Sequence, residues 1–144
     1  MCIKIITNLI KNSNTIVGSP SFIFMKARIE DINKFIPLIE LILTKPDMRG
    51  EALYYILEYM EKSLLIAPLK VFGLLENILK TVGKEIYDIQ KHFPASHSKA
   101  PLNIINTILK GYPEKEEKAM ELLDKLIELR WEGVKEYLSA FDRI

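Results

Sequence analysis

The sequence is poor in the residue types on which disulfide-linked folds, metal centres and turn-rich β-proteins depend. In 144 residues it has one cysteine, Cys2, two histidines and six glycines. A single cysteine excludes an internal disulfide and cannot form a cysteine-based zinc site by itself. So few glycines argue against a protein of short strands and tight turns. We expect a reducing, cytoplasmic setting and no cofactor.

The chain also lacks a dominant charge and a long apolar run. Its 20 Lys and Arg residues nearly balance 19 Asp and Glu residues, and the net charge of +1 provides no general attraction to nucleic acid or to an anionic membrane. No stretch approaches the roughly 18 uninterrupted apolar residues of a membrane span. The N-terminal stretch MCIKIITNLIKNSN is not followed by a small-residue cleavage site, so it does not resemble a signal peptide. We expect no membrane partner.

Residue types that favour α-helices are abundant. Hydrophobic residues make up 49% of the chain, and Leu, Ile, Lys and Glu dominate. The length predicts one domain, in which residues 1–27 are an atypical N-terminal cap or arm and residues 28–144 are helical. Apolar residues three or four positions apart predict helices within 30–45, 51–65, 67–83, 84–93, 101–111, 113–131 and 133–141. A further short helix at 1–12 would bring the total to about eight.

Three of the expected helices begin alike. Pro37, Pro68 and Pro101 are each followed by a leucine and an apolar run, and they are 31 and 33 residues apart. Proline suits the first turn of a helix, because an N–H there has no partner within the helix. Pro37 leaves a choice, since it lies inside the apolar pattern of 30–45: either that helix is kinked at Pro37 or a new helix begins there. The spacing predicts a repeating unit of a helix, a turn and a partner helix.

A helical hairpin of about 30–35 residues cannot bury its own apolar face, so neighbouring hairpins must stack. In its Pro37-Leu38, Pro68-Leu69 and Pro101-Leu102 starts and the apolar runs after them, the chain resembles the HEAT and armadillo-like helical repeats over residues 30–141. This resemblance in architecture implies an all-α, right-handed stack of helical hairpins, or α-solenoid, and a binding scaffold without inherited catalytic residues. An irregular helical bundle is the alternative, since the helices of a bundle also begin with proline.

Both histidines lie in the stretch KHFPASHSKAPLNI, residues 91–104. His92 and His97 are five positions apart, which does not place them on one helix face, and no further ligands are spaced for a metal ion. We interpret the stretch as a corner between helices, in which Ser96 or Ser98 caps the next helix. In the alternative interpretation it is a contact loop that offers an anion the donors of Lys91, His92, His97 and Lys99.

No motif for catalysis or nucleotide binding occurs in the sequence. It has no Gly-x-Ser-x-Gly nucleophile elbow, no glycine-rich phosphate loop, and no His-x-x-x-His or Glu-x-x-His pair for zinc or di-iron chemistry. Most carboxylates are paired with lysines at helical spacing, which is typical of a solvated outer face. We therefore expect that the chain is not an enzyme.

Three tyrosines crowd the helix expected at 51–65. Tyr55 and Tyr59 are four positions apart and flank its apolar stripe, and Tyr54 is adjacent to Tyr55. One interpretation places these side chains at the edge of the core. The other makes them anchors of a groove for a protein partner, since tyrosine is favoured at interfaces.

The predicted repeat places three lysines at equivalent helix ends: Lys45, Lys80 and Lys110. Lysines there complement the helix dipole, and equivalent positions in a stack also align along one ridge. A ridge of this kind is suited to phosphate contacts. The sequence thus favours a non-enzymatic scaffold that binds a protein partner, associates with itself or forms part of a larger repeat assembly. The alternative is a nucleic-acid-binding repeat module that uses these lysines.

Overall fold

The computed structural model describes residues 21–44, 46–82 and 98–142 of the chain. These residues form the α-helices α2 (Ser21–Lys26), α3 (Ile32–Leu43), α4 (Pro46–Lys62), α5 (Pro68–Val82), α7 (Ala100–Gly111), α8 (Glu116–Glu128) and α9 (Val134–Asp142). Short 3-10 turns complete them: η1 (Ile29–Asp31), η2 (Ser63–Leu65) and η4 (Pro113–Lys115). Within these ranges every regular element is helical, which confirms the predicted all-α class.

The predicted helix positions match most of these elements. α2 was not predicted as a helix and lies within the expected N-terminal cap or arm, residues 1–27. The short helix expected at 1–12 lies outside the described residues. The helix expected at 51–65 is α4, which begins five residues earlier because Pro46 occupies its first turn. The helix expected at 84–93 lies outside the described residues.

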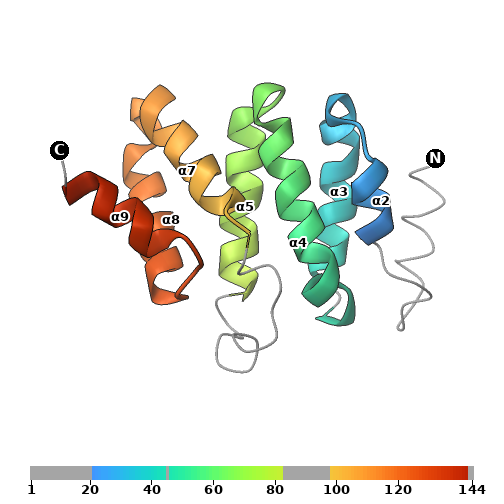
Figure 1. The fold of residues 1–144 in the computed structure, drawn as a ribbon. Coiled ribbons are helices and arrows are strands. Elements are labelled where there is room, and N and C mark those ends of the chain that lie inside the picture. Colours follow the sequence, from blue (N-terminus) through green and yellow to red (C-terminus); the bar gives the residue numbers. More distant parts are fainter. Residues whose placement is uncertain (1–20, 45, 83–97, 143–144) are drawn as a thin grey trace.

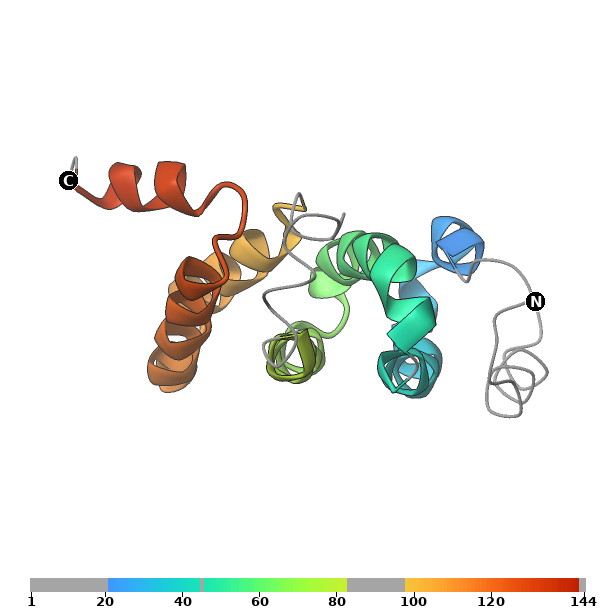
Figure 2. The ribbon, with the colours of Figure 1, turned by 90° about the horizontal axis from the view of Figure 1, so that it is seen from below.

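The helices form two layers that alternate along the chain (Figures 1 and 2). α2, α4, α7 and α9 form the front layer of Figure 1, which is the upper row of Figure 2, and α3, α5 and α8 form the back layer. Within the layers, α4 contacts α2 and α7, and α5 contacts α3 and α8. Between the layers, α3 packs on α4, α5 on α7, and α7 on α8. In two pairs of successive described helices the directions are opposite: α4 rises and α5 descends in Figure 1, and α7 and α8 repeat this pair.

The hydrophobic core fills the space between the two layers. α5 illustrates how the sequence produces it, because its apolar residues recur at helical spacing and are buried: Val71, Phe72, Leu74, Leu75, Ile78 and Leu79. Each of the longer helices α3, α4, α7 and α8 contributes a similar set of buried residues, and all of them belong to one continuous cluster. The two layers therefore hold each other through apolar contact along the whole described stack.

The three helices with a Pro-Leu start do not occupy equivalent places. α3 continues through Pro37, which lies inside the helix and is exposed, whereas Pro68 begins α5 and Pro101 is in the first turn of α7. α3 and α5 are neighbours in the back layer, but α7 belongs to the front layer. The predicted equivalence is therefore wrong for α7, and the back-layer helix that follows α5 is α8. A proline favours the first turn of any helix and carries no information about its layer.

A buried serine connects three parts of the stack. Ser98, only 1% exposed, donates from Oγ to Glu58 Oε1 on α4 at 2.9 Å, and its Oγ accepts the N–H of Ala100, the first residue of α7, at 3.1 Å. Its carbonyl oxygen accepts the indole Nε1–H of Trp131 at 2.8 Å. The interpretation of a helix corner is confirmed for Ser98, while Ser96 lies outside the described residues.

The end of α8 is shaped to bring the indole of Trp131 to the start of α7. Arg130 has a left-handed backbone with φ of 56°. The N–H of Arg130 donates to the carbonyl of Ile127 at 3.1 Å, and the N–H of Trp131 donates to the carbonyl of Leu126 at 3.0 Å. This is the Schellman pattern that satisfies the last carbonyls of a helix. Gly133, with φ of 90°, then turns the chain into α9.

We predict that Ser98→Ala destabilises the protein by about 1–3 kcal/mol, because the substitution leaves the half-buried carboxylate of Glu58 and the N–H of Ala100 without their partner. Ser139→Ala is the matched control. Ser139 is exposed and bonds only the carbonyl of Lys135 in its own helix, so we expect a change within about 0.5 kcal/mol. Urea unfolding followed by circular dichroism measures both, and equal effects of the two variants would contradict the role of Ser98.

Candidate functional site

Several of the residues proposed from the sequence are not among those that the structure describes. Lys45, Lys91, His92 and His97 are outside the described residues, so the contact-loop interpretation stays a prediction. Lys99 is described and exposed, and it immediately precedes α7.

The three tyrosines divide between the core and its edge. Tyr59 is 3% exposed and packs against the rings of Phe24 and Phe35, with centroids 5.9 and 5.6 Å away. Its hydroxyl donates to the carbonyl of Arg28 at 2.7 Å. Tyr54 and Tyr55 are half-buried and meet edge to face at 5.5 Å. Of the two interpretations, a core position or an anchor for a partner, Tyr59 therefore fits the core position, because its side chain is too buried to contact a partner.

The described lysines do not form one ridge. Lys80 is in the last turn of α5, in the back layer, and Lys110 is in the last turn of α7, in the front layer. Lys80 Nζ lies 3.3 Å from Glu76 Oε1, one turn earlier in its own helix. Each of these lysines is in the last turn of its helix, where its charge complements the helix dipole. This is the simpler of the two roles predicted from the sequence.

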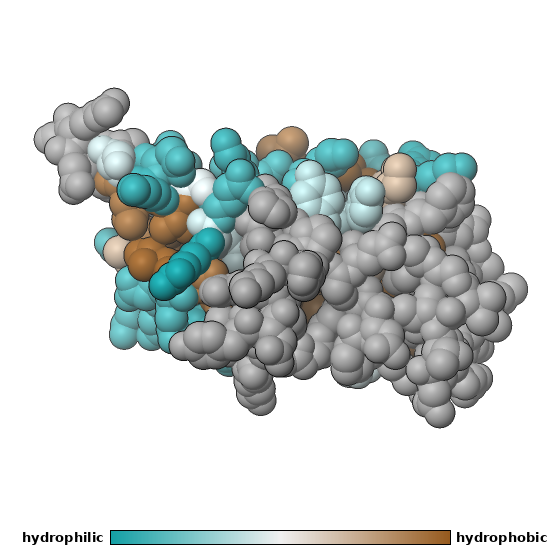
Figure 3. All heavy atoms as spheres, turned by 60° about the horizontal axis from the view of Figure 1, so that its bottom comes forward, coloured by the Kyte–Doolittle hydropathy of each residue, from teal (hydrophilic) through white to brown (hydrophobic). Residues whose placement is uncertain are grey.

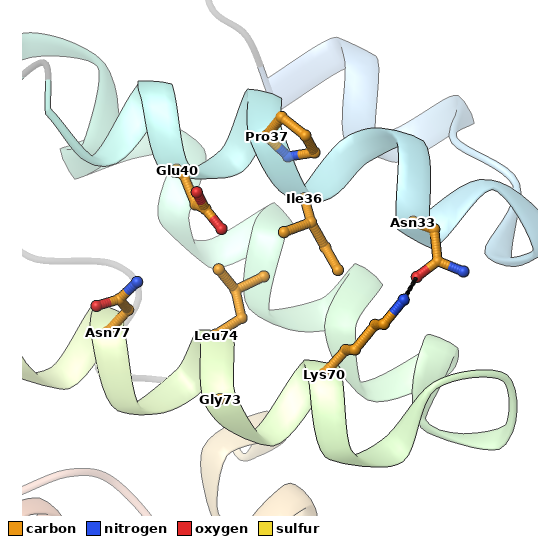
Figure 4. Close-up of a pocket in the computed structure, with 8 residues that line it drawn as sticks. All are labelled: Asn33, Ile36, Pro37, Glu40, Lys70, Gly73, Leu74 and Asn77. Carbon is orange, nitrogen blue, oxygen red and sulfur yellow. Dashed lines mark hydrogen bonds between the residues drawn. The ribbon is translucent and has the colours of Figure 1, made fainter.

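The structure contains a groove between α3 and α5 that the sequence analysis did not identify (Figure 4). It has a volume of about 370 Å³ and is lined from α3 by Asn33, Ile36, Pro37 and Glu40, and from α5 by Lys70, Gly73, Leu74 and Asn77. At one end Lys70 Nζ donates to Asn33 Oδ1 at 2.9 Å, which joins the two helices across the groove. Glu40 and Asn77 lie at the other end, and apolar side chains lie between.

A second groove follows on the other side of α5, between it and the start of α8. Its volume is about 650 Å³, and it exposes Leu69 together with four carboxylates and two lysines: Glu76, Glu114, Glu117, Glu121, Lys115 and Lys118. Lys118 Nζ lies 3.2 Å from Glu121 and 3.6 Å from Glu76, and the hydrogen bond and charge of Glu121 are the main reasons that the pKa of Lys118 is raised. The groove is therefore acidic, with one lysine already engaged by two carboxylates.

Gly73 belongs to both grooves. It is exposed near the middle of α5, and a Cβ added there would meet no other atom within 4 Å. Its backbone is not in the left-handed region, in contrast to that of Gly133. The sequence signal for this surface was a glycine inside an otherwise apolar helical pattern, where glycine is less stable than alanine.

Figure 3 shows a further apolar area, where hydrophobic side chains gather over α8 and α9. Trp131 and Val134 are buried at this end of the stack, and Tyr137 and Leu138 pack half-buried against the core. The Tyr137 hydroxyl donates to Asn106 Oδ1 of α7 at 3.1 Å, so α9 is fastened to the front layer. We interpret this area as the outer edge of the core.

Burial raises the pKa of Tyr59 from 10.0 to about 12. The folded-state pKa then lies above the unfolded one, so the contribution of this group to stability is present below pH 10 and is lost as the pH rises through 12. Tyr59→Phe should cost about 1 kcal/mol at pH 7, because the bond to Arg28 is lost. Between pH 8 and pH 12 the free energy of unfolding of the wild type should fall by about 2–3 kcal/mol more than that of Tyr59→Phe, because phenylalanine has no group that ionises there. Urea unfolding across this range tests the idea, which fails if both proteins lose stability in parallel.

Two glycine-to-alanine changes should act in opposite directions. Gly73→Ala should raise the free energy of unfolding by about 0.5–1 kcal/mol, because alanine is the better helix former and the added methyl meets no atom. Gly133→Ala should lower it by at least about 1–2 kcal/mol, because φ is 90° and the new Cβ would lie 3.1 Å from Leu102 Cδ1. Thermal unfolding of both variants measures these effects. A destabilised Gly73→Ala would show that Gly73 is required for folding.

Within the described part of the chain, no group of three or more His, Cys, Asp or Glu side chains is placed to hold a metal ion, and no helix is long and apolar enough to span a membrane. The two grooves of the back layer, which meet at Gly73, are the surface on which a function can be proposed. Comparison of this chain with protein-family models, with curated proteins and with solved structures found no match.

Proposed function

We propose that this protein is a non-enzymatic helical-repeat module that binds a protein partner on its back layer. In this proposal the two layers are a HEAT-like, right-handed stack of helical hairpins. The observation that carries the proposal is the pair of neighbouring grooves on either side of α5.

The arrangement of the helices favours a stack over an irregular bundle. Front and back helices alternate without exception among the described elements, and each layer extends in one direction in Figure 2. Within each layer, the main contacts join immediate neighbours: α2 with α4 and α4 with α7 in front, and α3 with α5 and α5 with α8 behind. Nearest-neighbour contact is typical of repeat proteins, in which each unit covers the apolar face of the next.

The back layer is suited to a protein partner because it combines apolar and polar contacts within a short distance. Leu69 is 43% exposed in the α5–α8 groove, and Ile36 contributes an apolar wall to the α3–α5 groove. Charged groups border both grooves, among them Glu40 and Lys70. The α3–α5 groove, in which Ile36 and Leu74 lie between polar ends, has the apolar centre and polar rim that are usual for a protein interface.

The nucleic-acid alternative has less support from the same surface. The larger groove has four carboxylates against two lysines, and these would repel phosphates. Among the predicted lysines that the structure describes, Lys80 is the one on the back layer, and it is already paired with Glu76. We therefore favour a protein over a nucleic acid as the ligand.

Affinity capture from an extract of the cells that make this protein tests the proposal. Immobilised wild type should retain a defined set of proteins, and Gly73→Trp should reduce their recovery at least tenfold, because an indole there fills the space between the two grooves. Nuclease treatment should not change the result.

Gly111→Trp is the matched control. Gly111 is also an exposed helical glycine with no atom within 4 Å of an added Cβ, but it lies at the end of α7 in the front layer. The Gly111→Trp variant should capture the same proteins as the wild type. Equal capture by all three proteins would contradict a binding surface at Gly73, and nuclease-sensitive capture would favour the nucleic-acid alternative.

A further inference from the structure

We infer that the partner segment is a basic amphipathic helix that lies in the α5–α8 groove and makes its closest approach to α5 at Gly73. This inference rests on the proposed function and adds the chemistry of the partner. Three independent features of the back layer support it: an unexplained glycine, an exposed leucine beside it, and a row of carboxylates opposite.

Nothing within the described chain explains a glycine at position 73. The position is not left-handed, and an added Cβ would lie in open space, so neither backbone geometry nor internal packing excludes a larger residue. A glycine inside a helix is less stable than an alanine. A contact from outside the chain gives it a physical reason, since a helix that crosses another at a glycine can bring its backbone closer than any side chain would allow.

Leu69 lies one turn before Gly73 on the side of α5 that faces α8. It is 43% exposed although it belongs to the lining of the groove, so it offers an apolar contact directly beside the point of close approach. A partner helix needs an apolar face to cover this leucine. Peptides that bind between helices use apolar residues at i, i+3 or i+4, and i+7 in this way.

The opposite wall of the groove determines the charge of the partner. Glu117 and Glu121 lie four residues apart on one face of the first turns of α8, and Glu114 lies in η4 directly before this helix. All three line the groove. Glu121 is bound to Lys118, whereas no ion pair joins Glu114 or Glu117 to another described residue. A helix with lysines or arginines at the same spacing would pair with these carboxylates while its apolar face covers Leu69.

An extended partner is less suited to this surface. A strand gains most of its affinity by adding to the edge of a sheet, and the back layer consists of helices whose backbone bonds are internal. A groove between two helices instead fits the side-chain ridge of a third helix. The geometry therefore favours a helical segment.

Binding of two synthetic peptides tests the inference. Both have 14 residues with leucines at positions 1, 4, 5, 8, 11 and 12 of a helix. One has lysine and the other glutamate at every remaining position. Fluorescence anisotropy at about 0.1 M salt should show the lysine peptide bound at least tenfold more tightly than the glutamate peptide. Doubling the salt should weaken the binding, because the carboxylates of the groove are exposed.

Variants locate the site. Gly73→Leu and the double change Glu117→Lys with Glu121→Lys should each weaken the lysine peptide at least tenfold. The controls Gly111→Leu and Glu136→Lys, on α7 and α9, should bind it as the wild type does. Equal affinity for both peptides, or binding that is insensitive to Gly73→Leu, would overturn the inference.

The peptide-binding test and the capture test can fail independently of each other. If neither peptide binds, but capture from cell extract still depends on Gly73, then the partner chemistry is wrong and the binding surface stands. If capture also fails to depend on Gly73, both proposals fall.

Discussion

Burial of apolar side chains between two rows of helices is the interaction on which the rest of this structure depends. A fully buried leucine or isoleucine is worth roughly 1.5–3 kcal/mol relative to an exposed one, and several come from each long helix. No helix covers its own apolar side, so each relies on neighbours in both layers. α4, α5 and α7 each have three helices as main neighbours: α2, α3 and α7 for α4, α3, α7 and α8 for α5, and α4, α5 and α8 for α7. They are therefore the centre of the stack, and their outward faces are left for other roles.

Apolar burial has no direction, so polar contacts decide how neighbouring helices are oriented. Ser98 does this at the start of α7 by bonding Glu58, Ala100 and the indole of Trp131. Tyr59 does it at the other end of the described stack, where its ring joins an aromatic cluster and its hydroxyl bonds the chain before α3. The side chains of Ser98 and Tyr59 are both buried and hydrogen-bonded, and satisfied polar contacts of this kind favour a single arrangement of the core.

The binding surface follows from this arrangement. The spacing of α3, α5 and α8 is set by side chains on the core side, and the grooves are the space that remains on the outside. Gly73 widens that space at the point where the two grooves meet, at a cost in helix stability that the core is able to offset. A rigid scaffold of this kind can hold a partner with little loss of its own conformational freedom, which favours affinity.

The sequence by itself determined the helical class, most helix positions and a serine cap, by Ser96 or Ser98, at the corner before α7, because the spacing of apolar residues and the prolines and serines at helix starts act locally. Pro68 marks the first residue of α5, and Pro113 begins the 3-10 turn η4 that leads into α8. Only the tertiary structure decided which helices share a layer, and therefore that Lys80 and Lys110 are apart while Asn33 and Lys70 meet. Helical periodicity reports that one face of a segment is buried, but the same pattern serves either layer. The identity of the neighbour depends on contacts between residues far apart in the chain, and those contacts also create the grooves around Gly73.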